Sequence, residues 1–344
     1  MKTVKESGSV RIDLLGGTID FAPISLILPK AVTLNMAINK KASVTIEEAG
    51  ELKTLEICSL DYDVSVQVPQ DIISSRDFYC EKFQKFALLL EICNLFNLNS
   101  GIKVTTQSGS PPGAGLGGSS TMGVVFYQAC YKYIHGNLKG FDPQQCQREV
   151  MNIEALILRS GPCGHQDYFP ALYGGILEIV PTIKGIEVHQ LFTRKLKQEL
   201  EERITLVNSK QNRFSGINNW EVYKSFFDNR ANAVKTLTQI SEYAYSASEY
   251  LKEERFDEFF DLMIEEGKLR AKFFKNFQTD EMNDVLKEIQ KSLPHVGIKV
   301  CGAGGGGHFL FIHKKGEREK IRELFTSKNI NMNISDYSVE EPEN

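Results

Sequence analysis

The sequence predicts a protein of mixed strands and helices arranged in two domains. A chain of 344 residues exceeds the length at which a single hydrophobic core usually stops growing. The first 60 residues contain short β-branched and apolar runs, which are separated by turn signals such as 47–50. Residues 215–293 instead carry apolar residues at helical spacing, with charges between them. We place the boundary at 190, so that the domains are residues 1–190 and 191–344.

Apolar spacing and turn signals predict the elements between these two regions. Residues 79–97 carry apolar side chains at helical spacing, and residues 101–106 are typical of a strand. A loop then leads into a helix expected over 121–134, for which Ser119 or Ser120 is a candidate N-cap. The further expected elements are a helix over 143–160 and strands over 175–180, 204–208, 297–301 and 308–313.

Composition excludes several classes of function. With 40 Lys and Arg residues against 44 Asp and Glu residues, the formal net charge is −4, which argues against a nucleic-acid-binding protein. The best apolar run, 24–28, stops at Pro29 and is far shorter than the roughly 18 residues of a membrane span. The seven cysteines form no CxxC pair, and the N-terminus has no apolar signal core. We expect a cytoplasmic monomer or homodimer that binds neither nucleic acid nor membrane.

A glycine-rich loop at 111–120 is the strongest candidate for a binding site. It contains four glycines, two prolines and two serines between an expected strand and an expected helix. Sterically open backbone N–H groups and a helix N-terminus together favour phosphate binding. The alternative is a capped loop that needs glycine for positive φ angles. The candidate phosphate-binding residues are Pro112, Gly113, Ala114, Gly115, Leu116, Gly117, Gly118, Ser119 and Ser120.

Two common phosphate-binding motifs nearly match this loop, but both fail. A P-loop would have a lysine after its second glycine, where this chain has Ser119. A dinucleotide-binding fold would have an acidic residue about 20 positions further on, but none occurs between 113 and 141. A second glycine cluster, 302–307, leads into an expected strand rather than a helix. By itself this cluster is equally consistent with a flexible connection.

Four segments, taken in order, resemble the GHMP small-molecule kinases: 11–20, 111–120, 161–167 and 302–307. The resemblance covers nearly the whole chain. It implies an α+β fold in two domains, of which the first is similar to ribosomal protein S5 domain 2 and carries the phosphate loop. The second domain would be ferredoxin-like and carry the cluster at 302–307, with Gly304 and Gly305 at the nucleotide.

Within this family the sugar kinases are the most similar. Arg11 matches an arginine of galactokinases and heptose-phosphate kinases, where mevalonate kinases usually carry lysine. The segment 161–167 is similar to the galactokinase segment that ends in the proposed catalytic aspartate. Galactokinases have Glu-His where this chain has Gly17 and Thr18, whereas heptose-phosphate kinases have glycines there. Gly118 also stands where the family usually has a serine.

The resemblance implies two catalytic residues. Asp167 would accept or orient the proton of the acceptor hydroxyl, and Arg11 would stabilise the negative charge of Asp167 and of the transferred group. The alternatives are a turn or capping aspartate and an exposed arginine at a strand end. Cys163 and His165 could suggest a nucleophile or a metal site, but no further spaced ligands support that interpretation.

The resemblance also implies a metal site and a substrate site. Hydroxyls of Ser119 or Ser120, with the carboxylate of Glu154, would bind Mg²⁺, which prefers oxygen ligands. For Glu154 the alternative is a solvated helix glutamate. The candidate substrate residues are Asp20, Gly17, Gly164 and Tyr223. For Asp20 the alternative is a turn residue, and for Tyr223 an aromatic residue of the core.

The sequence therefore predicts an ATP- and Mg²⁺-dependent kinase that acts on a hydroxyl, with the anomeric hydroxyl favoured, of a hexose or heptose or its phosphate. A mevalonate-type kinase of the same family is one alternative. The other is a kinase-like protein that senses a sugar and ATP without turnover. A structural protein that binds no nucleotide would leave the glycine-rich loop unexplained.

Overall fold

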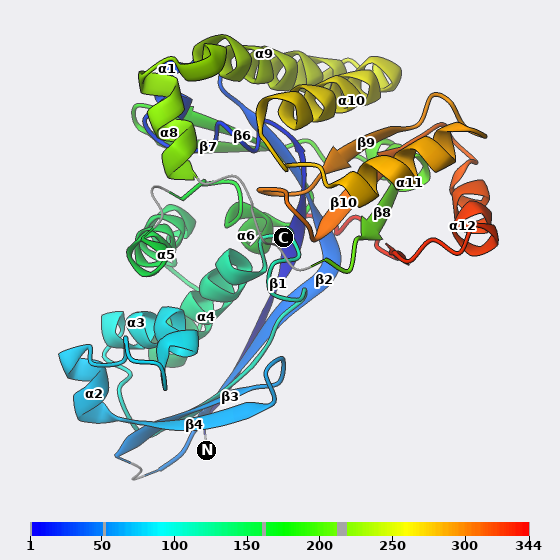
Figure 1. Ribbon diagram of the computed structural model, residues 1–344. Coiled ribbons are helices and arrows are strands. Elements are labelled where there is room, and N and C mark those ends of the chain that lie inside the picture. Colours follow the sequence, from blue (N-terminus) through cyan, green and yellow to red (C-terminus); the bar gives the residue numbers. More distant parts are fainter. Residues whose placement is uncertain (1, 51–52, 160–162, 212–218, 344) are drawn as a thin grey trace. The chain divides into compact units, whose positions relative to one another are not determined.

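A computed structural model describes residues 2–50, 53–159, 163–211 and 219–343 (Figure 1). The chain divides into two compact units that interleave along the sequence. Unit 1 consists of residues 1–10, 40–112 and 117–172, and unit 2 of residues 11–39, 113–116 and 173–344. Neither unit coincides with a single continuous segment, because β1 (Thr3–Leu15) and β2 (Thr33–Glu48) contribute to both. The boundary at 190 stays a prediction about where the chain separates into folding domains.

Unit 1 contains a mixed sheet in the order β4–β3–β5–β2. β5 (Ile102–Gln107) pairs antiparallel with the second half of β2 and parallel with β3 (Thr54–Ser59). β4 (Val64–Pro69) forms the antiparallel edge. Side chains on β3 and β5 alternate between buried and partly exposed, which is the pattern of a sheet with one face on a core. The β-rich character predicted for the first 60 residues is thus confirmed.

The helices of unit 1 pack as a group. They are α2 (Gln70–Ser75), η1 (Gln84–Phe86), α3 (Ala87–Leu95), α4 (Gly118–His135), α5 (Pro143–Leu158) and α6 (Phe169–Tyr173). The helix expected over 79–97 is shorter than predicted, because residues 80–83 form a turn before η1. α5 begins after Asp142, whose side chain accepts a hydrogen bond from the Gln144 N–H.

The start of α4 differs from the sequence prediction in an instructive way. The helix begins at Gly118, three residues earlier than expected, and neither Ser119 nor Ser120 is its N-cap. Gly117 occupies the cap position with φ of 72°, in the left-handed region that favours glycine. The two serines therefore lie inside the first turn, where their hydroxyls are available for other partners.

Unit 2 contains two groups of strands. The first half of β2 pairs antiparallel with β6 (Ile176–Thr182), which pairs in turn with β7 (Gly185–Gln190). A separate sheet has the order β11–β8–β10–β9, antiparallel throughout. Its strands are β8 (Ile204–Asn208), β9 (Gly297–Val300), β10 (His308–Ile312) and β11 (Asn333–Ser335). Helices follow β8 and β10 along the chain, so this sheet has the predicted ferredoxin-like βαββαβ topology.

The amphipathic helical pattern predicted for residues 215–293 is confirmed where these residues are described. The helices of unit 2 include those of this region. They are α1 (Ile24–Ile27), α7 (Arg194–Arg203), α8 (Asn219–Phe227), η2 (Arg230–Asn232), α9 (Ala233–Lys252), α10 (Phe256–Phe273), α11 (Asp280–Gln290) and α12 (Arg318–Ser327). α9 and α10 lie side by side (Figure 1). Apolar residues of α11 and α12 pack on Phe309 and Phe311 of β10 in one buried core. In the described part of the chain, no helix is both long and apolar enough to cross a bilayer.

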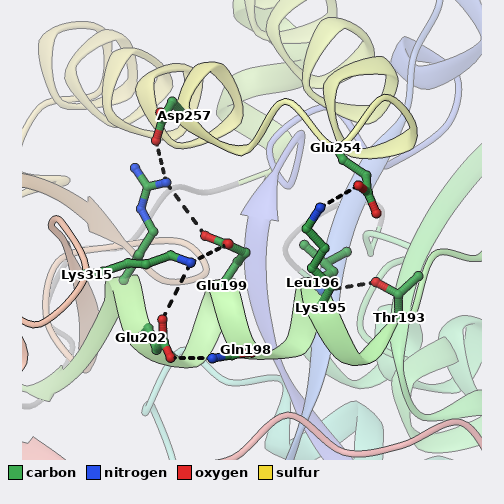
Figure 2. Close-up of polar contacts among 10 residues, drawn as sticks. Thr193, Lys195, Leu196, Gln198, Glu199, Glu202, Glu254, Asp257 and Lys315 are labelled. Atoms are coloured by element: carbon green, nitrogen blue, oxygen red, sulfur yellow. Dashed lines mark hydrogen bonds and ion pairs between the residues drawn. The ribbon is translucent and has the colours of Figure 1, made fainter.

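Several ion pairs join α7 to neighbouring segments of unit 2 (Figure 2). Thr193 caps the helix by accepting a hydrogen bond from the Leu196 N–H at 3.0 Å. Lys195 pairs with Glu254 at 2.5 Å, and both side chains are more than half exposed. Arg203 pairs with Asp257 at 2.6 Å, and Lys315 with Glu199 at 2.6 Å. Because water screens the Lys195–Glu254 pair, it contributes only about 0–1 kcal/mol to stability.

Candidate active site

The first turn of α4 is connected to Glu154 of α5 by hydroxyl groups. Ser119 Oγ donates to one carboxylate oxygen of Glu154 at 2.6 Å, and Ser120 Oγ donates to the other at 2.6 Å. Tyr168 OH donates to the second oxygen as well, at 2.7 Å. Glu154 is only 6% exposed, so it is not a solvated helix glutamate. The three residues predicted for the metal site therefore lie together in unit 1.

Hydroxyl groups supply the hydrogen bonds that Glu154 receives from the described residues. Burial raises the pKa of its carboxyl, and the hydrogen bonds from Ser119, Ser120 and Tyr168 oppose that rise. The nearby negative charge of Asp167 raises the pKa of Glu154 further. Among the described residues no lysine or arginine compensates the Glu154 carboxylate. The site therefore has an electrostatic preference for an added cation.

The donors at this site fit Mg²⁺. They are a carboxylate and two aliphatic hydroxyls, all oxygen ligands, at the start of a helix. Mg²⁺ usually takes one or two carboxylates from the protein and completes its shell with water and substrate phosphates. No group of three or more His, Cys, Asp or Glu residues that could hold a metal occurs within the described residues.

The start of α4 also fits an anion. Among the described residues, the backbone N–H groups of Gly118, Ser119 and Ser120 have no acceptor. Such N–H groups, with the positive end of the helix dipole, bind phosphate oxygens. Gly113, Gly115 and Gly117 all have φ between 72° and 77°, so the requirement for positive φ is real as well. The two interpretations of the loop are compatible.

Asp167 lies in the turn that precedes α6, and its side chain is partly exposed. Its charge affects both Glu154 and Tyr168, so the predicted base belongs to the same neighbourhood of unit 1 as the predicted metal residues. Gly164 lies in the same loop and is partly buried, whereas residues 161–162 of the matching motif lie outside the described residues. His165 is buried, and burial lowers its pKa to about 3.

The two glycine clusters, which lie almost 190 residues apart in the sequence, come together within unit 2. The His308 N–H donates to the Ala114 carbonyl at 2.9 Å. A Cβ atom added to Gly115 would lie 2.8 Å from the Cys301 carbonyl oxygen, so only glycine permits this backbone contact. The Gly305 N–H donates to the Phe277 carbonyl at 2.9 Å, and Gly304 packs on Phe277. Whether Gly304 and Gly305 also bind a nucleotide stays a prediction.

Arg11 lies on β1 and holds the first glycine loop in place. Its backbone N–H donates to the Leu116 carbonyl at 3.1 Å, and Nη1 donates to the Gly115 carbonyl at 2.5 Å. The side chain is buried, which excludes the alternative of an exposed arginine at a strand end. Loop residues 115 and 116 are therefore fixed to β1 through both the backbone and the side chain of one residue.

The predicted substrate residues of unit 2 share one neighbourhood. Gly17 and Asp20 lie in the turn after β1, and Asp20 is buried. The neighbours of Asp20, Ile19 and Phe21, belong to a core that also contains residues of α8, and Tyr223 packs against this core. Tyr223 also stacks on Trp220, with ring centroids 5.4 Å apart. This packing fits the core-aromatic alternative for Tyr223, and its contact with a substrate stays a prediction.

Sequence reasoning missed a cluster of four buried charges in unit 2. It consists of Asp13 on β1, Glu266 and Arg270 on α10, and Lys299 on β9. The available signals were weak: Asp13 lies two residues after Arg11 on the same strand, and Glu266 and Arg270 are one helical turn apart. Tyr168 was also missed, although it directly follows Asp167.

Comparison with known protein families identifies the chain. The family description "GHMP kinases N terminal domain" matches residues 81–175, and "GHMP kinases C terminal" matches residues 247–330. The chain belongs to the GHMP kinase family. The glycine loop, Glu154 and Asp167 lie in the first matched region of this GHMP kinase, and 302–307 in the second. Arg11 and Asp20 lie outside both regions.

Individual relatives include both sugar and mevalonate kinases. A bifunctional fucokinase/GDP-fucose pyrophosphorylase of Arabidopsis thaliana is 28% identical over 332 residues, covering 92% of this chain and 30% of that protein. The chain thus spans less than a third of that relative's length. Mevalonate kinase of Saccharolobus solfataricus is 23% identical over 248 residues, which is 72% of this chain and 73% of that protein.

The fold of this GHMP kinase matches solved structures along its length. The crystal structure of a D-glycero-D-manno-heptose 1-phosphate kinase from Bacteroides thetaiotaomicron aligns with a TM-score of 0.72 at 21% identity. The alignment covers 98% of this chain and 97% of that chain. The two-domain GHMP kinase fold of mixed strands and helices is therefore confirmed.

Proposed function

We propose that this GHMP kinase transfers the terminal phosphoryl group of ATP, with Mg²⁺, to a hydroxyl of a hexose or heptose or its phosphate. The observation that supports this most strongly is Glu154, a buried carboxylate held by Ser119, Ser120 and Tyr168, with no cation paired to it within the described ranges of the chain. Burying a carboxylate is costly, and a bound cation would lower that cost. Bound Mg²⁺ would neutralise charge on the phosphates.

The amides at the start of α4 are proposed to bind the phosphates of ATP. Three adjacent N–H groups point along the helix axis from a loop that glycines shape, and they supply donors without side-chain crowding. Phosphoryl transfer proceeds through a loose transition state, so positioning and charge neutralisation account for most of the catalysis. Arg11 is proposed to stabilise negative charge on the transferred group while its own contacts fix residues 115 and 116.

Asp167 is proposed to act as the base. It accepts the proton of the acceptor hydroxyl as that oxygen forms a bond to the γ-phosphorus. The bond from this phosphorus to the β,γ-bridging oxygen breaks, and ADP leaves with that electron pair. The partly exposed position of Asp167 beside the Glu154 site supports this role, because a base must reach the substrate.

A sugar is favoured over mevalonate as the acceptor. Asp20 offers a buried carboxylate in the turn after β1, and carboxylates suit the several hydroxyls of a sugar. Arg11 has the residue type of the sugar kinases. The fucokinase-containing relative aligns over 92% of this chain, against 72% for the mevalonate kinase. Gly17, Gly164 and Tyr223 complete the proposed substrate residues.

The test is an assay of ADP release with hexoses, heptose phosphates and mevalonate as acceptors. We expect turnover with a sugar or sugar phosphate. Asp167→Asn should lower kcat by about 10²–10⁴-fold while ATP binding is retained. Asp63→Asn, a change of an exposed acid in the β3–β4 hairpin of unit 1, is the matched control and should leave kcat unchanged.

Three results would contradict parts of the proposal. Unchanged turnover in Asp167→Asn would remove this residue from the mechanism. Turnover with mevalonate alone would replace the sugar as the acceptor. Ligand-dependent ATP binding without ADP release for any acceptor would instead identify a sensor.

A further inference from the structure

The buried charge cluster of unit 2 consists of two acids and two bases that neutralise one another. Asp13, Glu266 and Lys299 are 0% exposed, and Arg270 is 1% exposed. Arg270 Nη1 donates to Asp13 Oδ2 at 2.9 Å, and Lys299 Nζ lies 3.8 Å from the same oxygen. Lys299 also pairs with Glu266. Such a cluster is costly to desolvate and is weak evidence for a purely stabilising role.

Two hydrogen bonds connect this cluster to the backbone of the proposed binding segments. Glu266 Oε1 accepts from the Gly16 N–H at 2.9 Å, directly before Gly17 of the proposed sugar-binding turn. Arg270 Nη2 donates to the Gly302 carbonyl at 2.8 Å, at the start of the second glycine cluster. A series of charge-assisted hydrogen bonds, with one longer ion pair between Lys299 and Asp13 at 3.8 Å, therefore runs from one segment to the other.

The helix α10, which carries Glu266 and Arg270, is packed directly on β9 of the sheet. A Cβ atom on Gly267, between Glu266 and Arg270, would lie 2.4 Å from the Ile298 carbonyl of β9. Arg270 is held further by the Phe277 ring, whose centroid lies 4.5 Å from its guanidinium carbon. Because α10 contacts β9 without an intervening side chain, a shift of one bonded segment cannot be absorbed by loose packing.

We propose that Arg270 is a positioning residue that couples the sugar-binding turn at Gly16–Gly17 to the nucleotide loop at 302–307 through Asp13, Lys299 and Glu266. This inference rests on the proposed function. A movement of Gly16 on sugar binding displaces Glu266, which alters its pairing with Lys299 and hence the Asp13–Arg270 pair that holds Gly302. By linkage, a nucleotide that orders 302–307 favours the same arrangement of the turn.

The test measures the dissociation constant of a non-hydrolysable ATP analogue with Mg²⁺, with and without a saturating sugar substrate. In the unaltered protein we expect the sugar to tighten nucleotide binding by about fivefold or more, the usual range of a coupling between two sites. Arg270→Lys keeps the positive charge but cannot donate hydrogen bonds to Asp13 and to the Gly302 carbonyl with the planar geometry of a guanidinium. In this variant the ratio of the dissociation constants of the ATP analogue, without sugar and with sugar, should fall below about twofold. An unchanged ratio would overturn the inference.

Glu178→Gln is the matched control. Glu178 is a buried carboxylate of β6 that Ser248 and Lys252 satisfy, and it forms no contact with the four-charge cluster. This variant should lower the melting temperature without changing the ratio of nucleotide affinities. A reduced ratio here too would show that general destabilisation explains the Arg270 result, and the inference would be wrong.

A measurement on the unaltered protein keeps the inference testable if Arg270→Lys does not fold. Hydrogen exchange of the Gly16 amide, which donates to Glu266, should slow when the nucleotide analogue binds alone. Unchanged exchange at Gly16 would overturn the inference. Failure of the proposed function is distinguishable, because it would appear as an absence of turnover; turnover without coupling would refute the inference alone.

Discussion

Two buried carboxylate sites in this chain compensate their negative charge in opposite ways. In unit 1, Glu154 is held by three hydroxyls and by no cation of the residues that the structure describes, and burial raises its pKa. In unit 2, burial would raise the pKa of Asp13, but the charges of Lys299, Arg270 and Arg11 outweigh this and lower it. Both carboxylates are buried, so the difference comes from the partners that the fold supplies.

This difference shows which of the two sites already contains cations that balance its carboxylates. The unit 2 cluster already contains its cations, so its two acids are neutralised within the fold. At Glu154 the described part of the chain supplies no cation, and the oxygen donors there are suited to a metal ion that arrives with phosphates. Exposed pairs such as Lys195–Glu254, whose lysine lies on α7, are a third case (Figure 2). Screening by water there leaves the ion pair with little effect on stability.

The same substitution at the two sites should give the largest contrast. Glu266→Gln leaves Lys299 without its nearest acid and should destabilise the protein by about 3–5 kcal/mol. Glu154→Gln removes a buried charge that is paired with no cation among the described residues, and it should change stability by less than about 1 kcal/mol in the absence of Mg²⁺. Urea unfolding without metal measures both values. Equal losses at the two positions would mean that the sites do not differ electrostatically.

Removing the hydroxyls of the first turn of α4 should weaken the response to metal. In the double variant Ser119→Ala, Ser120→Ala, the Mg²⁺ concentration for half-maximal turnover should rise about 10–100-fold, because two oxygen donors are lost. The control is Ser74→Ala with Ser75→Ala, an adjacent exposed pair at the end of α2. An unaltered Mg²⁺ dependence in the first double variant would exclude these serines as ligands or supports of the metal.

His165 should give a smaller, pH-dependent effect, because burial lowers its pKa to about 3. The unfolded chain binds a proton near pH 6.5 while the folded protein does not, so this stability is present above that pH and is lost as the pH falls. Between pH 6.5 and 5.5 the loss should be about 1 kcal/mol.

Unfolding titrations of His165→Gln at both pH values isolate this contribution, which the variant should lack. His189→Gln, at an exposed position of β7, serves as the control and should keep the pH dependence of the unaltered protein. If His165→Gln and the unaltered protein lose the same stability, His165 is not a buried neutral group.

The smallest effect is expected on α7. Glu254→Gln should change the free energy of unfolding by less than about 0.5 kcal/mol, because both partners of the Lys195–Glu254 pair are exposed. The free energies of unfolding of the variant and the unaltered protein are compared at low and at high salt. At high salt, screening should remove even this small difference. A loss of several kcal/mol, independent of salt, would show that exposure does not decide the value of ion pairs in this protein.

Much of the fold could be predicted because local patterns report it. The strand over 204–208 is confirmed residue for residue, and the strand over 308–313 differs by one residue, because apolar runs between turn signals mark buried strands. The glycine-rich loop stood out for a similar reason, since open backbone at a helix start has few other uses. The grouping of Ser119, Ser120 and Glu154 came from the family resemblance, and the structure confirms their proximity.

The amino-acid sequence by itself therefore determined local features: where strands and helices form, and which segments have the composition of a phosphate loop. Only the tertiary structure decided that α4 begins at Gly118, that Arg11 is buried against residues 115 and 116, and that Glu266 reaches the Gly16 amide. Periodicity extends over neighbouring residues, whereas Gly16 and Glu266 are separated by 250 positions. Long-range packing chooses such partners, because a buried charge must find its complement wherever the folded chain brings one.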